Sequence, residues 1–151
     1  MNDIHILSKF TGSIYRCTQA YTNEILKQYG LSCGSCSYLM TLYHNDGINQ
    51  NQISRELDID KAMSAREIKK LIRLGYVEKE VDRGDARAYR LHLTERGRSV
   101  IPDIRQVLHA WNDAVTRNLD ETERKELIRL LDVVLKEARH LRSIQKSDAW
   151  L

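Results

Sequence analysis

The fold is decided by residues 60–97, which have the sequence DKAMSAREIKKLIRLGYVEKEVDRGDARAYRLHLTERG. Asp60 can cap a helix that runs to about Leu74, and Gly75 is expected to end this helix. Apolar spacing predicts that the helix buries Ala65, Ile68, Leu71 and Ile72, whereas Met63, Ser64, Arg66, Lys69, Lys70 and Arg73 are expected to face largely outward.

After Gly75 the spacing of the apolar residues changes from helical to alternating. Residues 77–81 and 88–93 are therefore predicted to form two strands. The polar segment between them, residues 82–87, contains Gly84 and forms the tip of a predicted β-hairpin. The sequence thus predicts a basic helix that is followed directly by a hairpin with a charged tip.

Helices are also predicted before this segment. Asn49 can cap a short helix over residues 50–57, which with the basic helix gives a helix-turn-helix order. A longer helix over residues 4–28 is expected to end at Gly30. The next helix is expected to start at Ser35 or Ser37, with Tyr38, Leu39, Leu42 and Tyr43 on its buried side, and to end before a turn at residues 45–47.

Two long helices follow the hairpin. Thr94 can cap the first, and Pro102 predicts either a kink near residues 98–102 or a later helix start. Asp120 and Glu123 form a capping-box variant for the last helix. Its apolar stripe consists of Leu127, Leu130, Leu131, Val134, Leu135, Ala138 and Leu141.

The fold class that follows is mainly α with a small β-hairpin wing, a winged helix-turn-helix flanked by dimerisation helices. The expected division is an N-terminal dimerisation helix at 1–34, a DNA-binding domain at 35–98 and C-terminal dimerisation helices at 99–151. The long helices expose more apolar surface than a domain of about 65 residues can cover, and long helices gain most of their stability from packing. The sequence therefore predicts a homodimer.

Positive charge is concentrated in the middle of the chain. Residues 61–98 contain eleven Lys and Arg against six Asp and Glu, a net charge of +5, although the whole chain carries only +3. A basic segment with a helix-turn-helix order predicts a surface that faces the phosphates of duplex DNA. The basic helix would enter the major groove, and the slender arginine-bearing tip would suit the minor groove. The predicted DNA-binding residues are Lys61, Ala62, Met63, Ser64, Arg66, Lys69, Lys70, Arg73, Arg83, Asp85 and Arg87.

Several motifs resemble the MarR (multiple antibiotic resistance regulator) family of winged helix-turn-helix regulators. The matching segments are NQISREL at 51–57, DKAMS at 60–64, KLIRLGYV at 70–77, DRGDAR at 82–87 and LTERG at 93–97. The most specific part is the Asp-x-Arg of the hairpin followed by Leu-Thr-x-x-Gly, and the resemblance covers nearly the whole chain. Pro102 and the small polar Ser64 are compatible with this pattern.

The resemblance implies a homodimer whose first and last helices interlock and which binds a pseudo-palindromic operator. It implies repression, less often activation, relieved by a small ligand or by oxidation. The arginine matching Arg87 lies in the DNA minor groove in this family, and the aspartate matching Asp85 orients the wing. The family binds aromatic acids in a cleft between its first, second and fifth helices, which implies a small aromatic or phenolic effector.

The candidate ligand or redox residues are Cys17, Cys33, Cys36, Tyr38 and Trp111. The Cys33-x-x-Cys36 pair has three interpretations: two ordinary buried cysteines, a redox switch, or half of a zinc site. A helix N-terminus lowers a thiol pKa, which favours the switch. A zinc site would need two further ligands at suitable spacing, so no metal is expected.

Other classes of protein find less support. No catalytic triad pattern, glycine-rich phosphate loop or cofactor motif accompanies the carboxylates, so we expect neither an enzyme nor a bound cofactor. A helical protein–protein adaptor is the remaining alternative. The sequence has neither a long apolar run nor a secretion signal, which predicts a cytoplasmic protein without a membrane segment.

Overall fold

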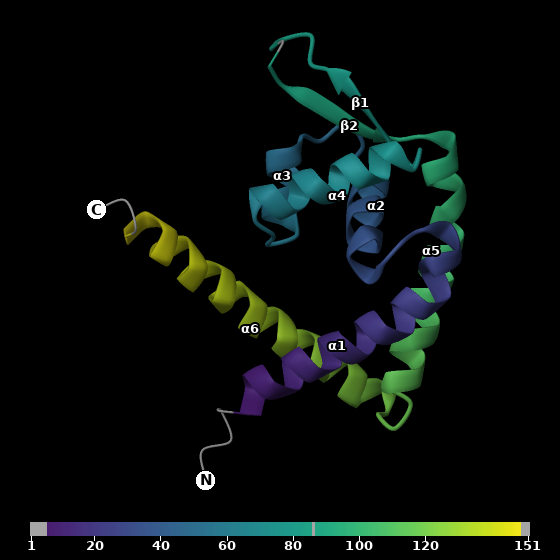
Figure 1. Cartoon of the computed structure of the whole chain (residues 1–151). Coiled ribbons are helices and arrows are strands. Elements are labelled where there is room, and N and C mark those ends of the chain that lie inside the picture. The colour runs from purple at the N-terminus through teal and green to yellow at the C-terminus, as the bar shows by residue number, and fades with distance from the viewer. Residues whose placement is uncertain (1–5, 86, 149–151) are drawn as a thin grey trace. The chain divides into compact units, whose positions relative to one another are not determined.

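The computed structural model describes residues 6–85 and 87–148. These residues fall into two compact units, which divide between Trp111 and Asn112. The prediction of a mainly helical chain with one β-hairpin is confirmed (Figure 1). The division into three segments at residues 34 and 98 stays a prediction. The elements are α1 (Leu7–Leu26), the 3-10 helix η2 (Lys27–Tyr29), α2 (Cys33–His44), α3 (Gln50–Glu56), α4 (Lys61–Arg73), β1 (Val77–Val81), β2 (Tyr89–Leu93), α5 (Glu95–Val115) and α6 (Glu121–Asp148).

Local capping signals set the ends of the short helices. The Asn49 side chain accepts a hydrogen bond from the Gln52 amide, and the Gln52 side chain accepts one from the Asn49 amide. Asp60 Oδ1 accepts a hydrogen bond from the Met63 amide at 2.8 Å and so begins α4. Gly75, with a φ of 80°, ends α4 in the left-handed conformation that glycine adopts without steric cost. The predicted N-caps of α3 and α4 are therefore confirmed.

The start of α2 differs from the prediction. Ser32 is the N-cap, so the helix begins at Cys33 rather than at Ser35 or Ser37. Ser35 instead completes the capping box, because its hydroxyl accepts a hydrogen bond from the Ser32 amide at 3.2 Å. The burial predicted for Tyr43 is also wrong: this residue is 41% exposed, and the Arg105 guanidinium lies 4.6 Å from the centre of its ring.

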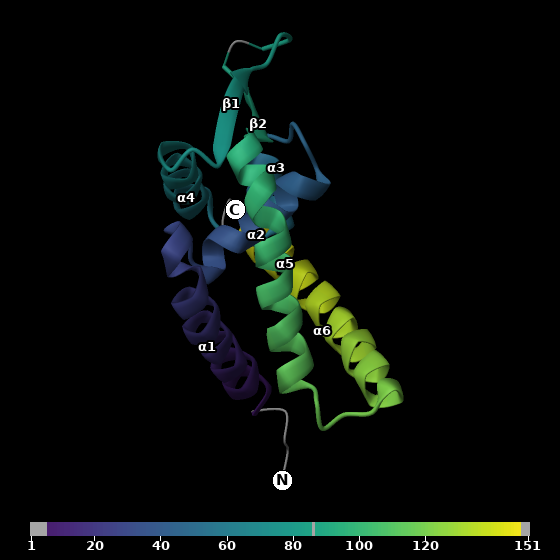
Figure 2. The same cartoon turned by 90° about the vertical axis from the view of Figure 1, so that its right-hand side faces the viewer.

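The hairpin is antiparallel, with Val77 opposite Leu93 and Val81 opposite Tyr89. The turn after α2 is held against β2, because the Gly47 amide donates to the Leu91 carbonyl and the Leu91 amide donates to the Ile48 carbonyl, both at 3.0 Å. The hairpin projects beyond the N-terminal end of α5 (Figure 2). Only the base of the wing is therefore held by the core, and its tip is free to contact a partner.

One hydrophobic core joins the helices of the first unit to the base of the wing. Its buried side chains come from α1, α2, α3, α4, both strands and α5, and the largest of them include Tyr38, Tyr76, Leu39, Ile53, Leu71 and Ile104. Tyr76 also donates a hydrogen bond from its hydroxyl to the Tyr29 carbonyl at 2.7 Å, which satisfies the polar end of a buried ring.

Two orientations predicted for α4 are wrong. Ser64 was expected to face outward but is fully buried, and its hydroxyl lies 3.1 Å from that of Tyr38. Ala65 was expected to face the core but is exposed. The buried face follows Ser64, Ile68 and Leu71, because the hydroxyl of Tyr38 supplies a polar partner that the sequence pattern does not show.

The first turn of α5 lies against Gly75 and Tyr76, which connect α4 to β1. The predicted cap is confirmed: Thr94 Oγ1 accepts a hydrogen bond from the Gly97 amide at 3.0 Å and donates one to the Gly75 carbonyl at 2.6 Å. The helix begins at Glu95 and contains Pro102, so the alternative of a later start is wrong. A kink near Pro102 stays a prediction.

In the second unit, α6 carries the predicted capping box. The Glu123 amide donates to Asp120 Oδ1 and the Asp120 amide donates to Glu123 Oε2, both at 2.9 Å. The large apolar side chains of the predicted stripe on this helix are exposed: Leu127, Leu130, Leu131, Val134, Leu135 and Leu141. Contiguous exposed apolar surface of this kind is uncommon on a single helix.

Candidate nucleic-acid interface

The outer face of α4 is basic. Lys61, Arg66, Lys69 and Arg73 are exposed, and the first turn also exposes Ala62 and Met63. Lys70 departs from this pattern, since it is half-buried and lies 3.7 Å from the Glu67 carboxylate. Most of the DNA-binding residues predicted on α4 are therefore exposed on its outer face. Ser64 and Lys70 instead face α2.

Hydrogen bonds within the wing hold its loop. Asp85 Oδ1 accepts a hydrogen bond from the Arg87 amide at 2.9 Å, and the Asp85 carbonyl accepts one from the Ala88 amide at 3.0 Å. Asp82 accepts hydrogen bonds from the Gly84 amide at 2.8 Å and from the Arg90 side chain at 3.2 Å. These two contacts, the amide first, hold the pKa of the Asp82 carboxyl below its ordinary value. The loop is thus shaped by two aspartates, while the side chains of Arg83 and Arg87 are exposed.

A cleft of about 670 Å³ lies between the wing and the helices α3 and α4. Three basic residues line it from three elements: Lys69 on α4, Lys79 on β1 and Arg87 in the wing loop. The amide side chains of Asn49, Gln50 and Asn51 line the same cleft. A cleft with convergent cations and amide groups matches the acceptor-rich backbone of a nucleic acid.

Lys79, Tyr89 and the amides at the start of α3 were not predicted as site residues. Tyr89 is 44% exposed, and the Lys79 ammonium lies 4.7 Å from the centre of its ring. The pairing of Tyr89 with Val81 places both residues beyond the part of the hairpin that the core covers. The pairing of the two strands follows from the alternation of their residues. It could have shown from the sequence that Tyr89 lies near the tip of the hairpin.

The cysteine pair does not have the environment of a reactive thiol. Cys33 is half-buried and Cys36 is buried, and neither forms a disulfide. Burial raises the pKa of both thiols, and it raises that of Cys36 to about 12, with a further contribution from the negative charge of Cys33. The expectation that the N-terminus of α2 lowers these pKa values is therefore wrong, because the loss of hydration outweighs the helix dipole.

Iodoacetamide at pH 7.5 is expected to alkylate Cys17 well before Cys36. Cys17 is exposed, whereas Cys36 is buried and burial raises the pKa of its thiol to about 12, so that it carries very little of the reactive thiolate at this pH. The rates are measured by mass spectrometry of peptides after timed quenching. The same reaction in urea is the control, in which the sites should react at similar rates. Equal rates for Cys17 and Cys36 in the folded protein would contradict the protection by burial.

The other candidate ligand residues do not gather at one site. Tyr38 is buried and bonded to Ser64, and Trp111 stacks on Tyr21 with their ring centres 4.9 Å apart. A cleft of about 320 Å³ does lie between α1 and α5. Tyr21, Ile25 and Tyr29 line it from α1 and η2, together with Asp103 from α5. The Tyr29 hydroxyl donates a hydrogen bond to Asp103 at 2.8 Å, which raises the pKa of this tyrosine.

Within residues 6–85 and 87–148, no three His, Cys, Asp or Glu side chains are arranged to hold a metal ion. Among the helices in these same ranges, none combines the length and the apolar character that crossing a membrane requires.

Comparisons with known proteins agree with this geometry. A sequence model of the MarR family matches residues 29–88. The chain is 33% identical to the HTH-type transcriptional regulator BilQ of Clostridioides difficile, over 85% of this chain and 86% of BilQ. Its fold is similar to that in the crystal structure of a MarR transcriptional regulator from Methanosarcina mazei, with a TM-score of 0.86. The two sequences are 34% identical, and the match covers 91% of this chain and 99% of that one.

A putative MarR family regulator from Listeria monocytogenes, crystallised with 26mer DNA, is also similar. It is 26% identical to this chain, with a TM-score of 0.85, and the match covers 93% of this chain and 91% of that one. The family consists of transcriptional regulators rather than enzymes. The chain shares sequence with BilQ over most of both chains, it matches the family model across the helix-turn-helix, and it has the same fold as the solved relative. This protein therefore belongs to the MarR family of transcriptional regulators.

Proposed function

We propose that this protein is a dimeric, sequence-specific DNA-binding regulator that represses transcription until a small ligand releases it. Residues 35–98 bind duplex DNA, and residues 1–34 and 99–151 form the dimer. The observation that carries the proposal is the convergence of Lys69, Lys79 and Arg87 on one cleft between the wing and the helices α3 and α4. The Listeria relative in complex with 26mer DNA supports the same conclusion.

In this proposal α4 enters the major groove, where its first turn meets the base edges. Arg66 reads guanine, since a guanidinium can donate two hydrogen bonds to O6 and N7, and Met63 contacts a thymine methyl group. Lys61, Lys69 and Arg73 contact phosphates. The burial of Ser64 removes it from the predicted DNA contacts, and Lys79, Tyr89 and the amides of Asn49, Gln50 and Asn51 join them.

Arg87→Ala is expected to weaken DNA binding by about 1–3 kcal/mol and to reduce the slope of affinity against salt by about one. Its side chain carries a positive charge on a loop that Asp85 holds in place, at the edge of the cleft. Fluorescence anisotropy across a salt series measures both quantities. Arg117→Ala, which removes one exposed positive charge in the segment before α6, is the control and should leave affinity nearly unchanged. Unchanged affinity in Arg87→Ala would refute the role of the wing.

Dimerisation is supported by the uncovered apolar faces of two helices. Leu7, Phe10 and Ile14 on α1 are exposed, as is the stripe on α6. Contiguous apolar patches of this kind mark protein–protein interfaces. Two-fold symmetry would set two α4 helices about one turn of DNA apart, on a pseudo-palindromic operator.

Release by a small aromatic or phenolic effector is supported by the cleft between α1 and α5, which Tyr21, Tyr29 and Asp103 line. This cleft offers aromatic surface and a hydrogen-bonded carboxylate in the same place. Release by oxidation of Cys33 and Cys36 has less support, because burial raises the pKa of both thiols.

Selection of bound duplexes from a random pool tests the proposal most directly. A dimeric regulator should enrich an inverted repeat whose half-sites are centred about one helical turn apart, with affinity that falls steeply as salt rises. A protein–protein adaptor would enrich no sequence. Failure to enrich any duplex at low salt would overturn the proposed function.

A further inference from the structure

The inner face of α4 carries polar groups where apolar side chains would suffice for packing. Ser64 is completely buried, and the side chains of Glu67 and Lys70 are only 20% and 31% exposed. Each lies against a polar partner on α2 or at its N-terminus. Apolar packing is non-directional, whereas hydrogen bonds have narrow limits of distance and angle. These contacts therefore constrain how α4 is rotated and shifted on α2.

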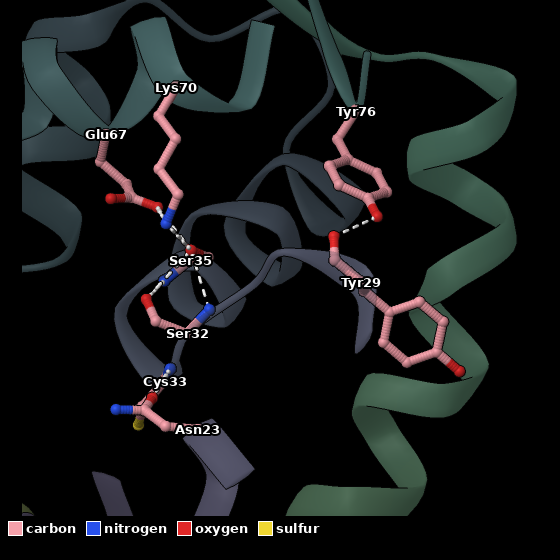
Figure 3. A network of polar contacts seen from close by, with 8 residues as sticks. All are labelled: Asn23, Tyr29, Ser32, Cys33, Ser35, Glu67, Lys70 and Tyr76. Carbon is pink, nitrogen blue, oxygen red and sulfur yellow. Dashed lines mark hydrogen bonds and ion pairs between the residues drawn. The ribbon is translucent and has the colours of Figure 1, made fainter. Parts of the chain in front are cut away.

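The first contact is centred on Ser35 (Figure 3). Its hydroxyl donates to Glu67 Oε1 at 2.5 Å, and the Lys70 ammonium lies 3.5 Å from the same hydroxyl and 3.7 Å from the carboxylate. Ser35 is itself held by the capping box with Ser32. The start of α2 thus presents a fixed hydroxyl to the middle of α4.

The second contact lies one turn earlier on α4. The Tyr38 hydroxyl lies 3.1 Å from Ser64 Oγ, and both residues are buried, at 2% and 0% exposure. Ser35 and Tyr38 are separated by three residues on α2, as Ser64 and Glu67 are on α4, so each pair shares a helix face. Two hydrogen bonds at separate heights fix the rotation of α4, which a single bond would not do.

We propose that Ser35 and Tyr38 are positioning residues for DNA reading: through Glu67 and Ser64 they set the rotation of α4 and so the direction in which its outer side chains point. The inference rests on the proposed function of α4 as the recognition helix. A rotation of about 20° moves an atom that lies about 5 Å from the helix axis by about 2 Å. Such a shift breaks a hydrogen bond to a base edge, but a flexible lysine can still reach a phosphate. The contacts therefore affect discrimination between sequences more than total affinity.

The test is the double variant Ser35→Ala/Tyr38→Phe, which changes no charge and no residue of the outer face of α4. Two probes are used: the duplex that the wild-type protein enriches from a random pool, and a mixed-sequence duplex of equal length. The ratio of the two affinities should fall about tenfold, the equivalent of one lost base contact. Affinity for the mixed-sequence duplex and its salt slope should stay unchanged, because no phosphate contact is lost.

Asn23→Ala is the matched control. It removes the side chain that accepts a hydrogen bond from the Cys33 amide at 2.7 Å, at the same helix start, yet among the described contacts Asn23 bonds neither Ser35 nor α4. The control should lose a similar amount of helix capping but keep the specificity ratio. Binding is measured well below the melting temperature of each variant, so that a loss of stability alone does not change the ratio. If the double variant does not fold, the nearly isosteric Tyr38→Phe alone should still lower the ratio.

The outcomes separate this inference from the function on which it rests. If the wild-type protein enriches no duplex, the proposed function fails and this inference fails with it. If the wild-type protein discriminates and the double variant discriminates equally well, only the positioning role is overturned. An equal fall of affinity for both duplexes would also overturn it, since it would indicate loss of folded protein or of phosphate contacts.

Discussion

Gly97→Ala is expected to destabilise the folded protein by about 3 kcal/mol or more, the upper range for forcing atoms into a packed site. An added Cβ at this position would lie 2.1 Å from the Tyr76 carbonyl oxygen and 3.2 Å from a methyl group of Leu93. The first distance is far inside van der Waals contact, and the obstacle is backbone, which cannot rotate away as a side chain can.

The surroundings of Gly97 leave little room for relaxation. The Thr94 amide donates to the same Tyr76 carbonyl at 3.1 Å, and Thr94 Oγ1 binds both the Gly97 amide and the Gly75 carbonyl. The Tyr76 ring is buried and its hydroxyl is bonded to the Tyr29 carbonyl. Moving α5 away from β1 would therefore break several hydrogen bonds and open the core at the base of the wing.

Thermal unfolding followed by circular dichroism measures the effect, and a fall in melting temperature of about 10 °C is expected. Gly34→Ala is the matched control, because it is also a helical glycine but an added Cβ would meet only Ser32 Oγ, at an ordinary 3.7 Å. Alanine there should leave stability unchanged or raise it by up to about 1 kcal/mol. A Gly97→Ala protein with the melting temperature of the wild type would show that α5 does not approach the Tyr76 carbonyl this closely.

Leu131→Asp is expected to convert a dimer into a monomer at micromolar concentration. Leu131 is 43% exposed in the single chain, so an aspartate there costs little in the monomer. In a dimer that buries the stripe of α6 the same carboxylate would be desolvated without a partner. The expected cost is about 3 kcal/mol or more, which raises the dissociation constant about a hundredfold.

Light scattering at several protein concentrations measures this change. Val133→Asp is the matched control: Val133 is 55% exposed on the same helix, but at about 3.6 residues per turn it lies about 120° around the helix from the middle of the stripe. The control should remain dimeric. A Leu131→Asp protein as dimeric as the wild type, or a Val133→Asp protein that dissociates equally, would contradict an interface along this stripe. Loss of the dimer should also weaken DNA binding, because the two half-sites would no longer be bound together.

The sequence was sufficient for the elements and their order because helix ends depend on neighbours in the chain. Asn49, Asp60, Thr94 and Asp120 each cap a helix through residues three positions away, so a short segment contains both partners. The hairpin follows from alternation, which is likewise local. The motifs around the wing also sufficed to indicate the family.

Only the tertiary structure decided which faces are buried and what the buried groups do. Ser64 faces inward because Tyr38, 26 residues away, offers it a hydroxyl, and Glu67 faces inward because Ser35, 32 residues away, donates to it. The pKa of Cys36 is raised because distant elements exclude water from α2. Gly97 is required because the backbone of Tyr76 passes against the first turn of α5. Capping and alternation are encoded within a few residues, whereas burial and close approach depend on segments that only the folded chain brings together.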